Sequence, residues 1–384
     1  MATTKVRGQL VDLNETASES GLKIPSGTEL NRPSTDVTGM VRNNTNETSG
    51  FSASCEEYYN GTEWKKITVV DNSAPFVAMN SDGNIEDING NITTVSATTP
   101  PYPNVEYNPN TGKYYYVAYN ISPNAISSST PFTGASWGND SVVTSNSRTT
   151  QCWYESVSGW MWVGRTEDAG VANAGNPGRL SPAGAFTAAW SNSQRNQNLG
   201  YDGTYYATGT RVGGTLYYTT DPTNTTWTTN SNFSGVNTSW VESDGSNNCI
   251  VMRASATTVY YGSAGFSGSF SSYTPSWTNN EIPIVYENGI WFAINASANK
   301  LWYSTDTLPS SAGAWSEVNY PSGQTYGGTY GNDASLLVRY RPVNSTWYAP
   351  SGNTSNNYWT STDGINWTAQ DTGSGKYITI ANFI

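Results

Sequence analysis

The 384-residue chain carries a formal net charge of −11 at pH 7, contains no histidine, and has charged side chains at only 12% of its positions. The acidic balance excludes a protein that binds nucleic acid through a basic surface, and the lack of histidine excludes a Ser-His-Asp triad and the commonest zinc ligand. No run of about 18 apolar residues is present, so we expect no insertion into a membrane, and the sequence predicts no cofactor and no metal site.

Residues 1–70 differ in sequence pattern from the rest and are predicted to form a small β-rich module. Residues 22–27 read as a short extended piece, residues 39–43 as a strand, and residues 57–67 as a hairpin across Asn60-Gly61, a dipeptide that supplies the positive φ of a tight turn. A segment this short, with few aliphatic side chains, needs a partner surface or self-assembly to stay folded.

The runs GLKIPSG, RPS, VTGMVRN and EYYNGTEW, which follow one another between residues 21 and 64, resemble a module of structural proteins of tailed bacteriophages, especially those of marine bacteria. The resemblance implies an attachment or oligomerisation segment ahead of a variable outer region. Its partners would be other virion proteins or further copies of the chain, for example in a homotrimer.

Residues 104–384 contain a repeat in which a turn glycine precedes an apolar strand. The markers lie at spacings of 47, 44, 42, 44 and 42 residues and are Gly112, Gly159, Gly203, Gly245, Gly289 and Gly331. The fifth repeat predicts four strands, at residues 282–286, 289–294, 300–304 and 314–318. Four strands in about 44 residues make one blade of a β-propeller.

The six markers predict an all-β fold with a six-bladed β-propeller over residues 104–384. Residues 376–384 form one further apolar strand, which would complete the first blade and close the ring. The alternative is a seventh blade built from residues 68–103 and this tail, so residues 71–103 are predicted to be either a linker or a partial blade. Tryptophans at equivalent late positions are predicted to pack between blades: Trp137, Trp190, Trp227, Trp277, Trp315 and Trp367.

A hairpin near the end of the chain carries a motif. Ser361, Asp363, Gly364 and Trp367 resemble the Asp-box found in β-propellers of sialidase-like and related proteins, in a match that is close but short. Two further copies depart from the motif at its glycine; they comprise Ser304, Asp306 and Trp315, and Thr220, Asp221 and Trp227. The three aspartates are expected to bond backbone amides inside their turns, which is a structural role.

Catalysis is the less favoured interpretation of the repeats. The arginine signature that the resemblance to sialidase-like enzymes would require, Arg-Ile-Pro near the first blade, is absent, and Arg341-Pro342 does not replace it. Carboxylates that could form a glycosidase pair are Glu106, Glu155, Asp168, Glu242 and Glu287. Solvated turn carboxylates are the favoured interpretation of these residues, so we predict a protein that is not an enzyme.

The sequence therefore predicts a phage virion structural protein, a fibre-like or adhesin component whose propeller is displayed for binding to host-surface glycans. Tyr and Trp faces stack on sugar rings, and the 26 Tyr and 15 Trp exceed what the repeat core requires, although no individual residue can be assigned to glycan binding. The alternatives are a purely architectural head-decoration, tail or baseplate protein and a sialidase-like glycoside hydrolase.

Overall fold

The computed structural model describes the chain most completely between residues 198 and 381, with gaps at 211–213, 223–225, 255, 279–281, 296–297, 325, 327–336, 351–357 and 371–376. Before residue 198 it describes the strands given below and Pro109. The chain divides into two compact units, Met1–Asn72 and Ser73–Ile384, and each is described by itself.

The first unit contains one four-stranded sheet in the order β1-β2-β3-β4. Its strands are β1 (Ser26–Gly27), β2 (Val41–Asn44), β3 (Cys55–Tyr59) and β4 (Trp64–Lys66). β1 runs parallel to β2, the other pairs are antiparallel, and Tyr59 faces Trp64 across the last turn. β3 and β4 therefore pair antiparallel, as predicted, while the predicted turn at Asn60-Gly61 lies outside the described residues.

The second unit is all-β and has a propeller arrangement, with five consecutive antiparallel four-stranded sheets between β12 and β31. The first two consist of β12 (Arg148–Glu155), β13 (Trp160–Thr166), β14 (Gly178–Leu180) and β15 (Phe186–Ala188), then β16 (Gly200–Tyr201), β17 (Tyr206–Thr210), β18 (Thr215–Thr219) and β19 (Thr228–Thr229). The third consists of β20 (Thr238–Ser243), β21 (Cys249–Arg253), β22 (Val259–Gly262) and β23 (Ser271–Tyr273). The last two consist of β24 (Ile284–Glu287), β25 (Ile290–Asn295), β26 (Lys300–Ser304) and β27 (Ser316–Glu317), then β28 (Arg339–Arg341), β29 (Thr346–Pro350), β30 (Tyr358–Ser361) and β31 (Thr368–Gln370). The four strands predicted for the fifth repeat are thus confirmed as β24 to β27.

Two further four-stranded sheets belong to this unit. One consists of β8 (Asn104–Asn108), β9 (Lys113–Val117), β10 (Ala125–Ser128) and β11 (Gly138–Asn139). The other joins both ends of the unit, because β32 (Tyr377–Ile380) pairs with β5 (Val77–Asn80), which is followed by β6 (Asn84–Asp87) and β7 (Ile92–Thr94).

The expected count of six blades is wrong, because the described strands of the second unit form seven four-stranded sheets. The tail does not complete the sheet of β8 to β11, as expected, but forms a sheet with strands from residues 77–94, which was the alternative. The glycine markers missed this sheet for a physical reason. Its first strand and its other three strands come from opposite ends of the unit, so no turn joins its first strand to its second.

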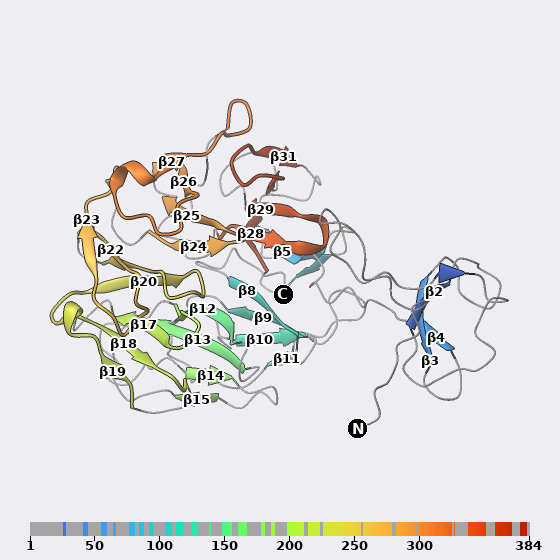
Figure 1. Ribbon diagram of the computed structural model, residues 1–384, viewed down its shortest axis with the longest axis horizontal. Helices are drawn as coiled ribbons and strands as arrows, with labels where there is room; N and C mark the ends of the chain where they lie inside the picture. Colours follow the sequence, from blue (N-terminus) through green and yellow to red (C-terminus); the bar gives the residue numbers. More distant parts are fainter. Residues whose placement is uncertain are drawn as a thin grey trace, which may run out of the picture. The chain divides into compact units, whose positions relative to one another are not determined.

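The sheets of the second unit follow one another around a common centre (Figure 1), with β8, β12, β20, β24 and β28 drawn nearest to it. β12 lies against β8, β20 against β17 and β24, and β32 against both β29 and β8. Trp162 packs with Tyr206 and Trp227 between the sheets of β12 and β16, and an ion pair joins Glu287 of β24 to Arg339 of β28. Each sheet therefore contacts the next around the ring.

The middle strands carry continuous apolar runs because neighbouring sheets cover both of their faces. All six residues of β25 are buried, as are the first four of β21. Trp227, Trp277, Trp315 and Trp367 are 4–8% exposed, and the Trp277 and Trp315 rings meet edge to face across two sheets with centroids 5.3 Å apart. The predicted packing between blades is confirmed for these four tryptophans, while Trp137 and Trp190 lie outside the described residues.

Three of the predicted marker glycines form the turn between the first and second strands of a sheet, namely Gly203, Gly245 and Gly289, each with positive φ. The sixth marker misplaces its strand, because Leu337 and Val338 lead into β28, the first strand of its sheet, instead of forming the second strand. The turn that follows β28 is made by Ser345 in the left-handed conformation, with φ of 50°. Gly112, Gly159 and Gly331 lie outside the described residues.

The helices in the described part of the chain are short 3-10 turns: η2 (Ser231–Phe233), η4 (Ala312–Ala314) and η5 (Pro342–Asn344). None of the described helices is long and apolar enough to span a bilayer.

Candidate functional site

The inner strands, which are the first strands of their sheets, share a five-residue register. A side chain at the first place bonds the backbone at the second place of the next inner strand. Asn104 Oδ1 accepts a hydrogen bond of 2.9 Å from Cys152 N, and Asn198 Oδ1 accepts one of 3.0 Å from Val241 N. In the same way Trp240 donates its indole N–H to the carbonyl of Ile284. The six five-residue registers are 104–108, 151–155, 198–202, 240–244, 283–287 and 337–341.

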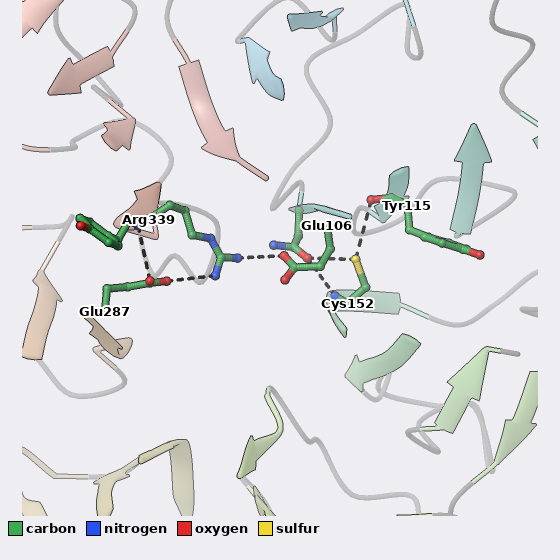
Figure 2. A network of polar contacts seen from close by, with 7 residues as sticks. Glu106, Tyr115, Cys152, Glu287 and Arg339 are labelled. Atoms are coloured by element: carbon green, nitrogen blue, oxygen red, sulfur yellow. Dashed lines mark hydrogen bonds and ion pairs between the residues drawn. The ribbon is translucent and has the colours of Figure 1, made fainter. Parts of the chain in front are cut away.

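Four charged side chains of these registers, three from the third place and one from the fifth, interact with one another. We call Glu106, Glu242, Glu287 and Arg339 the axial cluster. Arg339 Nη2 donates to Glu106 Oε2 at 2.9 Å, and Arg339 Nη1 lies 3.7 Å from Glu287 Oε1 (Figure 2). Glu287 Oε2 also accepts a bond of 3.4 Å from Tyr340 N. One guanidinium thus joins carboxylates from two other sheets.

The Arg339–Glu106 pair is deeply buried, with side chains that are 6% and 3% exposed, whereas Glu287 is 24% exposed. The Arg339 guanidinium carbon lies 5.5 Å from the centroid of the Trp153 ring, which closes one side of the pair. Burying ions is costly unless they are paired and hydrogen-bonded, so Glu106 and Arg339 are held in place by each other.

Burial shifts the carboxyl groups of the axial cluster toward their neutral form. Desolvation raises the pKa of Glu106 to about 7, although the Arg339 charge opposes the shift. Desolvation also raises the pKa of Glu242 to about 8, with a hydrogen bond from Ser243 N opposing it and repulsion from Glu287 adding to it. The pKa of Glu287 is raised by the same desolvation and lowered by Arg339. The carboxyl groups of the cluster therefore hold their protons more tightly than an exposed glutamate does.

Three of the carboxylates singled out from the sequence, Glu106, Glu242 and Glu287, belong to this cluster. Glu155 lies at the end of β12 with a side chain outside the described part of the structure, and Asp168 also lies outside it. Arg339 was missed, because the misplaced sixth marker left its strand unassigned; its signal was a lone arginine at the register place where other inner strands carry Glu106 and Glu242. No group of three possible metal ligands occurs among the residues that the structure describes.

The turn of residues 361–367, between β30 and β31, is held by the motif residues. Asp363 Oδ1 accepts hydrogen bonds from Ile365 N at 2.9 Å and Asn366 N at 2.8 Å, and it also accepts one from Ser361 Oγ at 2.9 Å. Desolvation is the largest single influence on the exposed Asp363 carboxyl and raises its pKa, but the hydrogen bonds together outweigh it and hold the pKa well below its usual range. The Trp367 indole N–H donates to the Gly364 carbonyl at 3.1 Å.

Gly364 is required in this turn for two reasons. Its φ of 73° is strained for any other residue, and a Cβ at this position would come within 2.7 Å of Ile290 Cδ1. Ile290 belongs to the neighbouring sheet, and so does Phe292, whose ring centroid is 6.4 Å from that of Trp367. The turn of residues 361–367 therefore packs against the sheet of β24 to β27.

The two incomplete copies keep only part of this bonding. Ser304 Oγ accepts a bond of 3.2 Å from Asp306 N, and Trp315 donates its indole N–H to the Tyr273 hydroxyl at 2.6 Å. In the earlier copy the hydroxyl that accepts from Asp221 N, at 3.1 Å, belongs to Thr219 and not to the expected Thr220, which is exposed. Thr219 stands two places before its aspartate, as Ser304 and Ser361 do.

No family model matches the sequence, and no curated protein matches it. Among solved structures, a chain of the mitotic checkpoint complex is similar at 11% identity and a TM-score of 0.50, over 81% of this chain and 88% of that one. The virginiamycin B lyase from Staphylococcus aureus is similar at 12% identity and a TM-score of 0.51, over 72% of this chain and 85% of the lyase chain. At these identities the similarity shows the fold alone, a β-propeller.

Proposed function

We propose that this chain is a structural component of a phage virion, an adhesin or fibre-like element that displays a β-propeller for binding to host-surface glycans. The proposal rests on the resemblance of residues 21–64 to a phage attachment module and on the aromatic repeats of the second unit. The first unit would dock to other virion proteins or join copies of the chain. Weak contacts with glycans would gain strength from the many copies on one particle.

We also propose that the seven sheets of the second unit are the blades of one closed propeller. The sheet of β5, β6, β7 and β32 supports this, because it ties the end of the chain back to residue 77 and its strand β32 contacts the sheets on both sides, at β29 and β8. A closed ring is a rigid carrier for a binding surface at the outside of a particle.

The state of Arg339 is the observation that favours binding over catalysis. A sialidase-like enzyme needs arginines free to bind the substrate carboxylate. Arg339 is instead buried and paired with Glu106 and Glu287, so the carboxyl groups of its own chain already occupy its guanidinium. The axial cluster is therefore better suited to holding three sheets together than to binding an anionic substrate.

An electron-microscopic reconstruction of the intact particle tests the proposal. We expect the second unit to point into solvent from a tail or fibre, and purified chain to bind cells of the host. A propeller enclosed between other virion proteins on all sides would overturn the adhesin proposal and establish the architectural role instead. A chain missing from the particle would overturn both.

One observation favours glycoside hydrolysis as a second candidate function. The raised pKa values of Glu106 and Glu242 provide protonated carboxyl groups near neutral pH, and a general acid in a glycosidase needs such a group. Incubation of the purified chain with host polysaccharide tests it. Release of reducing sugar by the native chain but not by Glu242→Gln would establish the enzyme, and no release by either would remove this candidate.

A further inference from the structure

The fourth place of the five-residue register is a tyrosine in five of the six described registers. We call these residues the tyrosine ring: Tyr107, Tyr154, Tyr201, Tyr286 and Tyr340. In the remaining register, 240–244, the place is taken by Ser243. None of the five is buried, and Tyr201, at 36%, is the large apolar side chain most exposed in the described part of the chain.

Each tyrosine of the ring faces a buried side chain on the second strand of its own sheet. These directly opposed partners are Tyr114, Met161, Tyr206, Trp291 and Trp347, which are 0–6% exposed. Tyr201 stacks on Tyr206 with centroids 4.4 Å apart and planes 28° apart. The other aromatic pairs have centroids 4.5–4.9 Å apart. The buried partners thus restrict the tyrosine side chains, so a ligand that binds them would cost little further loss of side-chain entropy.

The shared register gives the five tyrosines equivalent places in their sheets. Equivalent places on inner strands that surround one centre occur at one level, here the end where the first strand of each sheet turns into the second. Gly245 and Gly289 form two of these turns, and nothing lies within 4 Å of where their Cβ atoms would be. At Gly203, in contrast, a Cβ would lie 2.6 Å from the Gly245 carbonyl oxygen, so the turn beside Tyr201 packs against the turn of Gly245.

The fifth places, which follow the fourth, are acidic in four registers and carry one cation, Arg341, after Tyr340. Glu287 directly follows Tyr286 and keeps 24% of its side chain exposed, and Asp244 of the preceding sheet is close enough to act on the Tyr286 hydroxyl. Carboxylates accept hydrogen bonds from sugar hydroxyls and attract protonated amines, but they repel the carboxylates, sulfates and phosphates of acidic glycans. The net charge of −11 adds to this repulsion at long range.

From these contacts we infer that the tyrosine ring is the glycan-binding surface and that it takes neutral or amino-sugar chains, whose rings stack on the tyrosines. This inference rests on the proposed function, since it assigns the surface that the proposed adhesin uses. Removing one stacking ring should weaken binding about three- to tenfold, and removing two should weaken it by more than tenfold.

The test is binding of the full-length chain to an array of immobilised neutral, amino-sugar and acidic glycans. The variants are Tyr201→Ala, Tyr286→Ala and their double substitution, and Tyr201→Phe keeps a stacking face. The matched control is Tyr261→Ala, a half-buried tyrosine on β22, away from the inner strands. Tryptophan fluorescence verifies that each variant is folded.

Binding to neutral or amino-sugar glycans that is lost in the double variant and kept in Tyr201→Phe and Tyr261→Ala would support the inference. If the native chain binds such glycans and the double variant binds equally well, the tyrosine ring is not the site, while the adhesin proposal stands. Binding to acidic glycans alone would overturn the choice of ligand. A native chain that binds no glycan would overturn the adhesin proposal and the inference together.

Discussion

Replacing Arg339 with methionine tests whether the axial cluster holds the propeller together. The change keeps most of the apolar length of the side chain and removes the charge that faces Glu106 at 2.9 Å and Glu287 at 3.7 Å. Glu106 is 3% exposed, so water cannot replace the lost partner. Removing one member of a buried ion pair costs about 3–5 kcal/mol of unfolding free energy, because the other charge stays buried without compensation.

The cost should depend on pH. Arg339 lowers the pKa of Glu106, which burial raises to about 7, so without the arginine this pKa rises further. At pH 8 the variant must either bury an ionised carboxylate or take up a proton, and the full penalty applies. At pH 5.5 Glu106 is protonated, and the penalty should fall below about half of its value at pH 8.

The assay is urea unfolding followed by tryptophan fluorescence at both pH values, with the slope of the transition compared between variants. The control is Lys300→Met, which breaks an ion pair of 2.7 Å with Glu317 whose side chains are 44% and 32% exposed. Such a surface pair contributes about 0–1 kcal/mol. The double variant Glu106→Gln/Arg339→Met should recover part of the loss at pH 8.

Equal costs for Arg339→Met and Lys300→Met at pH 8 would refute the reasoning, and so would a penalty that grows on acidification. Either result would mean that water or another group reaches Glu106 when the arginine is gone.

Three further outcomes are expected. The pKa of Glu242 is raised from 4.5 to about 8, so the folded protein binds this proton more tightly than the unfolded chain and the unfolding free energy should fall as pH rises from about 4.5 to 8. Glu242→Gln should make this fall shallower in urea unfolding at four pH values. An unchanged pH dependence in the variant would contradict the prediction. Asp363→Ala should lower the unfolding free energy by about 1–2 kcal/mol, because it removes the acceptor of the hydrogen bonds in its turn. The Asp306 carboxylate accepts none of the hydrogen bonds found among the described residues, so Asp306→Ala should cost less than about 0.5 kcal/mol by the same assay. Equal losses would count against the difference between the two turns. Deleting residues 377–384 removes β32, the strand that contacts both β29 and β8, and should abolish the cooperative thermal transition measured by calorimetry. A truncated chain with the same transition as the full chain would show that the ring does not depend on β32.

Short sequence patterns were sufficient to predict several strands and buried side chains. The four strands of the fifth repeat and the four buried late tryptophans each depend on neighbouring residues, because turn glycines and apolar runs act over a few positions. Asp363 illustrates the same point, since all the groups that bond its carboxylate lie within three residues of it. Such features can be read from the chain without knowing the fold.

Only the tertiary structure decided the number of sheets and the composition of the axial cluster. The pairing of β32 with β5 joins opposite ends of the unit, and the partners Glu106 and Arg339 are separated by 233 residues. No short-range signal encodes such contacts, because they arise when whole sheets close around one centre and bring the same register place of several inner strands together. For the same reason the tyrosine ring appears in the sequence as five scattered tyrosines. Only the shared register of the inner strands shows that they occupy equivalent places.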